Sequence, residues 1–275
     1  MGAVLALLSS VLWGSADFIG GVSSRRAAPL AVYGVSQAFG AVVLAAMATV
    51  TGSWSAPVGY WTWGVAASLV GMLGMWAFYR ALAIGPMGIV SPLVAVAVIV
   101  PVAFALLFRG EMPHGAQVLG MIIAVAGILL ASGPELVGAQ SARPIALGSL
   151  AAVTFGVFYI VVAEGSRISP IMTMVAMRMT TMALFIPILL VFRGFGGVRR
   201  VDLPRLAILG AFDASANVMF GYASTQGLLS TTSVLGSLYP VVTAILAAII
   251  LNERLRAVQY AGVAATLAGI VLISW

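Results

Sequence analysis

The residues Ser237 to Gly269 read SLYPVVTAILAAIILNERLRAVQYAGVAATLAG, which is an apolar helix, a short turn containing Glu253, and a second apolar helix with spaced glycines. The same arrangement occurs earlier in the chain, at a constant distance of 142 residues. This offset pairs Glu111 with Glu253 (253 − 111 = 142), Gln117 with Gln259 (259 − 117 = 142), Gly120 with Gly262 (262 − 120 = 142) and Gly127 with Gly269 (269 − 127 = 142).

The repeat extends to the start of each half, where the same offset pairs Trp13 and Gly14 with Phe155 and Gly156. Two unrelated apolar stretches would share Leu, Ala and Val through composition alone. Matches of Glu, Gln and spaced Gly at one register are much harder to obtain by chance. The sequence therefore indicates an internal duplication of about 142 residues.

The composition excludes a water-soluble fold, because 62% of residues are hydrophobic and only 7% are charged, against about 25% charged in a soluble domain. The chain has no cysteine and a single histidine, His114, which excludes a thiolate or histidine-rich metal centre. We therefore expect no metal and no cofactor. The net charge of +6 comes from arginine. In a membrane protein such residues report topology, so we expect no nucleic-acid partner.

A transmembrane helix needs about 20 apolar residues. Charge, proline and glycine punctuation divide the chain into ten such segments: 3–22, 30–50, 60–82, 87–108, 115–133, 145–164, 170–192, 204–226, 231–251 and 257–275.

The predicted fold is an all-α integral membrane protein with ten transmembrane helices in two inverted five-helix repeats. The repeats comprise residues 1–133 and 145–275, joined by a connecting loop at 134–144, and together form one transport domain. Five is an odd number, so the second half enters the membrane from the opposite side. Inverted repeats with a binding site near the membrane midplane recur among secondary transporters.

The sequence resembles the drug/metabolite transporter superfamily, specifically its ten-helix EamA-type members. The residues that carry the resemblance are Trp13 and Gly14, the YRAL sequence at 79–82, Arg178, and the helix–Glu–helix units around Glu111 and Glu253. The resemblance implies a central cavity and export of small metabolites, such as amino acids or amphipathic compounds, across a bacterial-type plasma (inner) membrane. It implies proton coupling, or else uncoupled facilitated diffusion or exchange. A complete inverted pair needs no second copy, so we expect a monomer.

Three ionisable residues fall inside predicted membrane helices, where charge is costly and by default marks a functional site. Asp17, Asp213 and Arg178 lie about 21, 20 and 12 Å from the face that holds the termini, at 1.5 Å per residue. The three side chains can therefore converge. One hypothesis is that Arg178 binds a substrate carboxylate while Asp17 or Asp213 binds an ammonium group or a coupling proton, which would suit a zwitterion. The alternative is a structural Arg–Asp pair that locks two helices together.

Neutral polar and aromatic residues are further candidates for a substrate-binding cavity. Asn217 lies one helical turn after Asp213, and Trp13 lies one turn before Asp17, so each shares a face with its carboxylate. The other candidates are Gln37, Tyr79, Tyr159 and Tyr239. The alternative for the aromatic residues is a place in the interfacial belts of the membrane.

Glu111 and Glu253 precede predicted helices, where a carboxylate caps exposed backbone N–H groups. We therefore expect a structural or gating role for both. Pro92, Pro101 and Pro240 lie in the fourth and ninth predicted helices, and proline there favours a bend.

A channel or lipid scramblase is a competing hypothesis, although no predicted helix carries the repeated polar face of a pore. An intramembrane enzyme would need a nucleophile and base at depth, or a metal cluster. The only histidine lies in a turn, so we do not expect an enzyme.

The arginine distribution predicts the orientation of the chain. Only Arg109 and Arg167 belong to the face that holds both termini. The opposite face carries Arg25, Arg26, Arg80, Arg143, Arg193, Arg199, Arg200, Arg205, Arg254 and Arg256. By the positive-inside rule both termini lie outside, whereas the resemblance implies cytoplasmic termini. We expect alkaline phosphatase fused to the C-terminus to be active and a fluorescent protein at the same position to be dark. The reverse pattern would refute the arginine count.

Overall fold

The structure is a computed structural model that describes residues 1–24, 26–84, 94–131, 142–192, 197–251 and 256–273. The regular elements of these residues are all helical. They are α1 (Gly2–Ser24), α2 (Pro29–Val50), η1 (Ser53–Ser55), α3 (Tyr60–Ile84), η2 (Val96–Val98), α5 (Ile99–Phe108), α6 (Gly115–Ala131), α7 (Ala142–Ser166), α8 (Pro170–Phe192), η3 (Arg200–Asp202), α9 (Leu203–Gln226), α10 (Leu229–Gly236), α11 (Tyr239–Ile250) and α12 (Ala257–Ile273).

Seven spans in the described residues are long and apolar enough to cross a membrane, with α10 and α11 forming one span over Leu229–Ile250. Three shorter apolar segments, Val96–Phe108, α6 and α12, complete the ten predicted spans. The predicted boundaries agree with the observed helices to within a few residues in most cases. Most of the predicted connecting loop, 134–144, lies outside the described residues.

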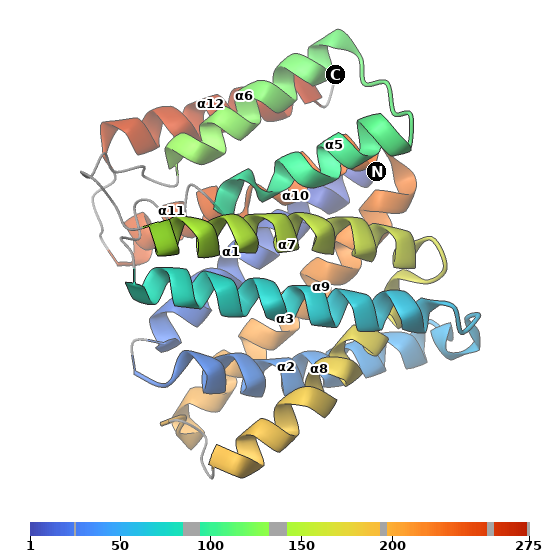
Figure 1. The fold of residues 1–275 in the computed structure, drawn as a ribbon, viewed down its shortest axis with the longest axis vertical. Helices are drawn as coiled ribbons and strands as arrows, with labels where there is room; N and C mark the ends of the chain where they lie inside the picture. The colour runs from blue at the N-terminus through green and yellow to red at the C-terminus, as the bar shows by residue number, and fades with distance from the viewer. Residues whose placement is uncertain (25, 85–93, 132–141, 193–196, 252–255, 274–275) are drawn as a thin grey trace.

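The helices lie side by side in layers that each combine the two halves (Figure 1). The pair α6 and α12 forms one edge of the bundle, α2 and α8 form the other, and α1 and α7 run through the middle. The start of α1 and the end of α12 lie toward the same end of the bundle. The contacts between helices are also paired: α1 packs on α9 as α7 packs on α3, and α2 packs on α9 as α8 packs on α3.

The crossing of α6 and α12 shows how the repeat is built into the packing. A Cβ atom on Gly120 would lie 2.8 Å from the Gly269 carbonyl oxygen, and one on Gly127 would lie 2.8 Å from that of Gly262. The reciprocal distances, from Gly269 to Gly120 O and from Gly262 to Gly127 O, are both 2.7 Å. Since the offset relates Gly120 to Gly262 and Gly127 to Gly269, the contact is self-complementary, as at a two-fold axis.

A second pair of contacts explains the glycine that follows Trp13 and Phe155. A Cβ atom on Gly14 would lie 2.6 Å from both the Tyr239 carbonyl oxygen and the Val242 Cβ, on α11. Gly156 makes the equivalent contact with Ala97 O at 2.5 Å and Val100 Cβ at 2.4 Å. The same offset of 142 relates the members of the two contacts (239 − 97 = 142; 242 − 100 = 142). Both glycines let two helices approach at backbone distance, which is how helices associate in lipid.

Irregular backbone occurs near proline in both segments in which a bend was predicted. The predicted helix 231–251 is in fact two helices, α10 and α11, with Pro240 in the first turn of α11. Proline cannot donate the backbone hydrogen bond that would continue α10. Pro101 is buried in α5 and follows the 3₁₀ turn η2. Pro92 lies outside the described residues.

The α6–α12 crossing predicts the cost of adding a side chain there. A Cβ atom on Gly127 would lie 2.4 Å from Thr266 Oγ1 and 2.5 Å from the Thr266 backbone nitrogen, whereas Gly115 on the same helix has nothing within 4 Å. Overpacking of this kind typically costs about 1–3 kcal/mol. Gly127→Val should therefore lower the melting temperature of the detergent-solubilised protein, measured by fluorescence, and Gly115→Val should change it much less. Equal melting temperatures for the two variants would contradict the packing described above.

Candidate functional site

Arg178 and Asp213, which come from different helices, form an ion pair inside the bundle. Arg178 Nη2 donates to Asp213 Oδ2 at 2.7 Å. The Arg178 side chain is 3% exposed and that of Asp213 is 24% exposed. Asn217, one turn along α9, donates from Nδ2 to the Asp213 carbonyl oxygen at 2.7 Å and to Asp213 Oδ1 at 3.2 Å. Asp213 therefore holds a fixed position between α8 and α9.

The guanidinium of Arg178 lies close to Gly40 of α2. A Cβ atom on Gly40 would lie 3.5 Å from Arg178 Cζ and 3.0 Å from the Gly210 carbonyl oxygen of α9. Gln37, one turn before Gly40, is buried as well. Three atoms of this region, Arg178 Nε, Gln37 Oε1 and Asn217 Oδ1, are buried without a hydrogen-bond partner among the described residues. Arg178 thus keeps one unused donor within a buried polar layer.

An aromatic cluster lies next to this layer and is centred on Trp13. The Trp13 ring centroid is 5.8 Å from that of Tyr159, 5.6 Å from that of Phe220 and 6.5 Å from that of Tyr239. Tyr159 and Phe220 are themselves 4.8 Å apart. The four rings come from α1, α7, α9 and α11, so this cluster joins the two halves of the chain. The interfacial-belt alternative does not describe them.

Asp17, one turn after Trp13 on α1, faces the same region. Its carboxylate is within electrostatic range of Asp213 and of the phenols of Tyr159 and Tyr239. Asp17 is nevertheless exposed, whereas Arg178 is almost completely buried. Asp17 therefore combines accessibility with neighbours on three other helices. None of the described residues forms a salt bridge with it.

Asp17 and Tyr159 are equivalent positions of the two repeats, because 159 − 17 = 142. Two repeat-related residues that lie close together must lie on either side of the axis that relates the halves. The 142-residue offset between Asp17 and Tyr159 can be read from the sequence. The sequence analysis named both residues as candidates but did not pair them. The ion pair has no such symmetry: the offset relates Arg178 to Ser36 and Asp213 to Gly71. The helix packing is therefore repeated in the two halves, whereas each charged residue occurs in one half only.

Glu111 caps a helix, but it is not the helix that follows it in sequence. Its carboxylate accepts hydrogen bonds from the Leu229 backbone nitrogen at 2.7 Å, the Ser230 backbone nitrogen at 3.0 Å and the Ser230 hydroxyl at 2.7 Å. These groups form the N-terminus of α10, in the other half of the chain. The local expectation was therefore wrong. The turn at Gly110, with φ of 63°, precedes Glu111, whose side chain reaches α10 rather than α6.

Glutamine provides the local contact at the turns before α6 and α12. Gln117 Oε1 accepts from the His114 backbone nitrogen at 3.1 Å, and Gln259 Oε1 accepts from the Arg256 backbone nitrogen at 2.9 Å. The two contacts are related by the repeat, since 256 − 114 = 142. Each closes the turn before its own helix, which explains why the glutamines match at the same register as the glutamates.

A second ion-pair group lies between the ends of α5 and α7. Arg109 Nη2 donates to Glu164 Oε1 at 2.5 Å, and Arg167 Nη1 lies 3.3 Å from Glu164 Oε2. Sequence reasoning treated both arginines only as topology signals and did not identify Glu164. Glu164 lies two residues from the end of α7. Nothing in the sequence around it indicates that its partner is Arg109, 55 residues earlier.

Three predicted residues cannot be placed in this arrangement. The side chain of Tyr79, together with Pro92 and Glu253, lies outside the described residues.

The comparisons with known proteins agree with the fold and the repeat. The model of the EamA-like transporter family matches the chain twice, over residues 1–133 and 142–275. The chain belongs to the EamA-like transporter family. A comparison with curated proteins gives no match. One solved structure, described as the crystal structure of a protein, is 18% identical to this chain and has a TM-score of 0.81. The match covers 98% of this chain and 94% of the other. At that identity the likeness shows the fold alone.

Membership of the EamA-like family makes this chain a multi-pass membrane transporter of the drug/metabolite transporter type. The predicted fold, ten membrane helices in two inverted five-helix repeats, is confirmed by the family match and the helices described above. The region where Asp17, Tyr159, Trp13 and the Arg178–Asp213 pair meet is the candidate site of this transporter, because transporters of this architecture bind their substrates between the repeats near the midplane.

The Arg178–Asp213 pair can be tested separately as a structural element. Removing one partner of a buried pair typically costs about 3–5 kcal/mol, whereas replacing both with apolar residues is often neutral. Arg178→Met alone should therefore lower the melting temperature strongly, and Arg178→Met combined with Asp213→Leu should recover much of the loss. Additive effects of the two substitutions, measured by thermal unfolding in detergent, would show that the pair is not coupled.

Proposed function

We propose that this protein is a secondary transporter of small organic compounds that carry an ammonium group, and that Asp17 binds this group. The single observation that supports the proposal is the position of Asp17: exposed, on the repeat axis opposite Tyr159, and near three aromatic rings. Substrate sites of inverted-repeat transporters lie at this axis.

The charges of the region favour a cationic ligand. The Arg178 guanidinium is already neutralised by Asp213 at 2.7 Å and is 3% exposed. Asp17 contributes a further negative charge within range of Asp213. With both carboxylates ionised, the three groups sum to one negative charge. A cation can neutralise it, and that cation is either a proton or an ammonium group.

The rings around Asp17 suit the organic part of such a ligand. An ammonium group over the face of Trp or Tyr is attracted by the ring, with about 0.5–2 kcal/mol from each favourable contact. Tyr159 and Tyr239 lie within electrostatic range of Asp17, and both rings pack against Trp13, as does that of Phe220. This combination of one carboxylate and several rings favours amphipathic amines over strongly polar or anionic solutes.

Competition between a proton and the ligand for Asp17 would couple the two fluxes. A carrier that binds either cation, but not both, exchanges one for the other across the membrane by alternating access. In this proposal Arg178 and Asp213 fix the local charge and position α8 against α9, and Arg178 does not bind a substrate carboxylate. An uncoupled facilitator or exchanger remains the second candidate, since the same site works without a proton.

Transport by purified protein in proteoliposomes tests the proposal. The panel comprises amphipathic amines, zwitterionic amino acids and carboxylates, each offered with and without an imposed pH gradient. We expect saturable flux of the amines that follows the gradient and falls at least tenfold in Asp17→Asn, because the neutral amide no longer attracts a cation. Asp202→Asn removes a carboxylate from the loop before α9 and should leave the flux unchanged.

Other outcomes separate the alternatives. Saturable amine flux that is indifferent to the gradient would indicate a facilitator or exchanger. Flux that does not saturate would indicate a channel. Transport of carboxylates alone, or amine flux unaffected by Asp17→Asn, would refute the assignment of Asp17.

A further inference from the structure

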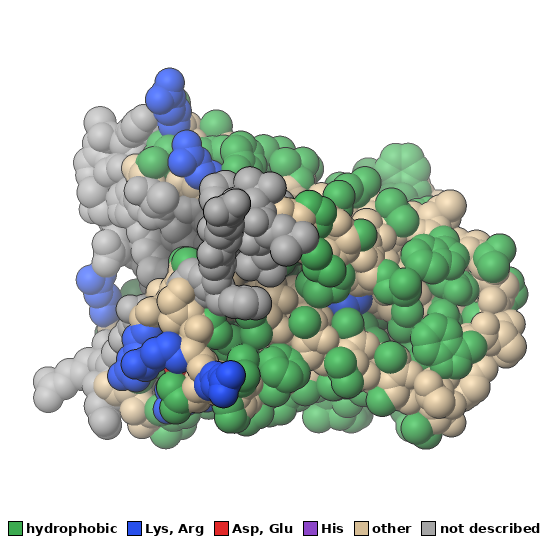
Figure 2. Space-filling view, turned by 90° about the horizontal axis from the view of Figure 1, so that it is seen from below, with side chains coloured by type: hydrophobic (Ala, Val, Ile, Leu, Met, Phe, Trp, Pro, Cys, Tyr) green, Lys and Arg blue, Asp and Glu red, His purple; other side chains and the backbone are tan. Residues whose placement is uncertain are grey.

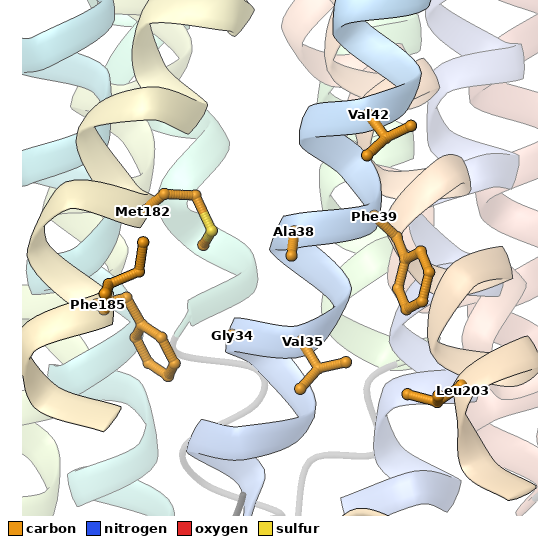
Figure 3. Close-up of a pocket in the computed structure, with 9 residues that line it drawn as sticks. Gly34, Val35, Ala38, Phe39, Val42, Met182, Phe185 and Leu203 are labelled. Carbon is orange, nitrogen blue, oxygen red and sulfur yellow. The ribbon is translucent and has the colours of Figure 1, made fainter. Parts of the chain in front are cut away.

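A groove on the outside of the bundle has no part in the proposed transport site. It has a volume of about 360 Å³ and lies on the face of α2, between α8 and the start of α9 (Figure 3). Met182 and Phe185 of α8 lie on one side of α2, and Phe39 and Leu203 on the other. Each lining side chain is apolar, and Val42 and Ile186 are more than half exposed, so the groove opens away from the bundle.

Glycine forms part of the floor of the groove. A Cβ atom on Gly34 would lie 1.8 Å from Phe185 Cε1, so the Phe185 ring rests against the backbone of α2. The ring is 2% exposed. The hollow beside it runs along α2 from Gly34 to Val42.

The length of the groove along α2 is comparable to one leaflet of a bilayer. The α2 residues that line the groove extend from Gly34 to Val42, a separation of 8 residues (42 − 34 = 8), which corresponds to about 12 Å along the helix. Half of the hydrocarbon core is about 15 Å thick. The groove is therefore nearly as long as one leaflet is thick.

Arginines surround the end at which the groove starts. Leu203 lines the groove and lies between Arg200 and Arg205, and both arginines are exposed. Arg26 is exposed as well, and Gly197 lies against its backbone, with 3.7 Å from an added Cβ atom to Arg26 O. Val35 and Phe39 of the groove belong to the same apolar cluster as Val198 and Leu206, which flank these arginines. Figure 2 shows the molecule from this side, with many apolar side chains and with most of the basic side chains in view gathered toward one end.

The carboxylate in this region is already occupied. Asp202 accepts the Arg199 backbone N–H at 2.9 Å and lies 3.7 Å from Arg199 Nε. Among the described residues, no carboxylate forms a salt bridge with Arg26, Arg200 or Arg205. The end of the groove therefore carries a net positive charge beside an apolar channel about 12 Å long.

We propose that the groove binds an acyl chain of an anionic phospholipid whose phosphate is held by Arg26, Arg200 and Arg205. Lipid hydrocarbon is as apolar as the groove, so burial of the chain alone selects nothing. Selectivity comes from the arginines, each of which contributes about a fivefold preference for an anionic surface. This site is separate from the Asp17 region and does not depend on the proposed substrate.

Native mass spectrometry of the protein released from nanodiscs tests this proposal. The nanodiscs contain equal amounts of phosphatidylglycerol and phosphatidylcholine with the same acyl chains. We expect the wild type to retain phosphatidylglycerol preferentially. The double variant Arg200→Gln, Arg205→Gln should lower the ratio of the two retained lipids about fivefold for each arginine removed. Arg143→Gln, an exposed arginine in the first turn of α7, should leave the ratio unchanged.

A second pair of variants tests the groove itself. Ala38 lines the groove and is exposed, so Ala38→Trp fills it without displacing the core. Ala45, also exposed, lies two turns further along α2 outside the lining. Ala38→Trp should reduce retention of both lipids several-fold, and Ala45→Trp should not.

Three results would overturn the proposal. Equal retention by the two tryptophan variants would show that the groove binds no acyl chain. An unchanged lipid ratio in the double arginine variant would show that the arginines do not hold the phosphate, and this measurement stands even where Ala38→Trp fails to fold. A protein dimer that is seen in the wild type and lost only in Ala38→Trp would show that the groove binds a second copy of the protein.

Discussion

The contact between backbones at the α6–α12 crossing is the constraint on which the rest of the structure depends. In lipid there is no hydrophobic drive between helices, so association relies on close packing and on small residues that permit it. Four glycines, related in pairs by the repeat, permit this packing. A Cβ atom added to any of them would lie 2.7–2.8 Å from a carbonyl oxygen of the facing helix. The same use of glycine recurs where Gly14 meets α11 and Gly156 meets the turn before α5. The halves can therefore join only in the register that the 142-residue offset defines.

This register brings Asp17 opposite Tyr159. Any inverted repeat places some pairs of equivalent residues next to its axis, and here that pair consists of a carboxylate and a phenol. A symmetric pair of carboxylates would concentrate like charge between the halves, and a symmetric pair of phenols would carry no charge. The difference between the copies leaves one exposed carboxyl group in the middle of the bundle, with aromatic rings from both halves near it. The function proposed above follows from this break in symmetry.

The sequence predicted the repeat, the ten spans and the membrane class, because these depend on composition and on residues that recur at a fixed spacing. It also selected Asp17, Arg178 and Asp213, because ionisable residues stand out in apolar helices. It offered the Arg178–Asp213 pair as one of two alternatives, and the structure shows this pair. It could not supply the partners of Glu111 and Glu164. Glu111 is four residues before Gly115, the start of α6, yet its carboxylate binds the N-terminus of α10, more than a hundred residues away. Glu164 gave no signal at all, since only the packing of α5 against α7 brings Arg109 to it.

The ion pair of Arg109 and Glu164 also differs from the repeated contacts in what it stabilises. In the alternating access proposed above, each half would adopt the arrangement of the other as the site opens to the opposite face. Contacts between equivalent glycines would be kept in such an exchange. Arg109 and Glu164 correspond to Leu251 and Val22 (251 − 109 = 142; 164 − 22 = 142), so an exchange of the two arrangements offers no second ion pair. In the proposed cycle this pair would stabilise one state only. Its free energy would then contribute to the difference between the two states, whereas the free energy of the glycine crossings would be the same in both.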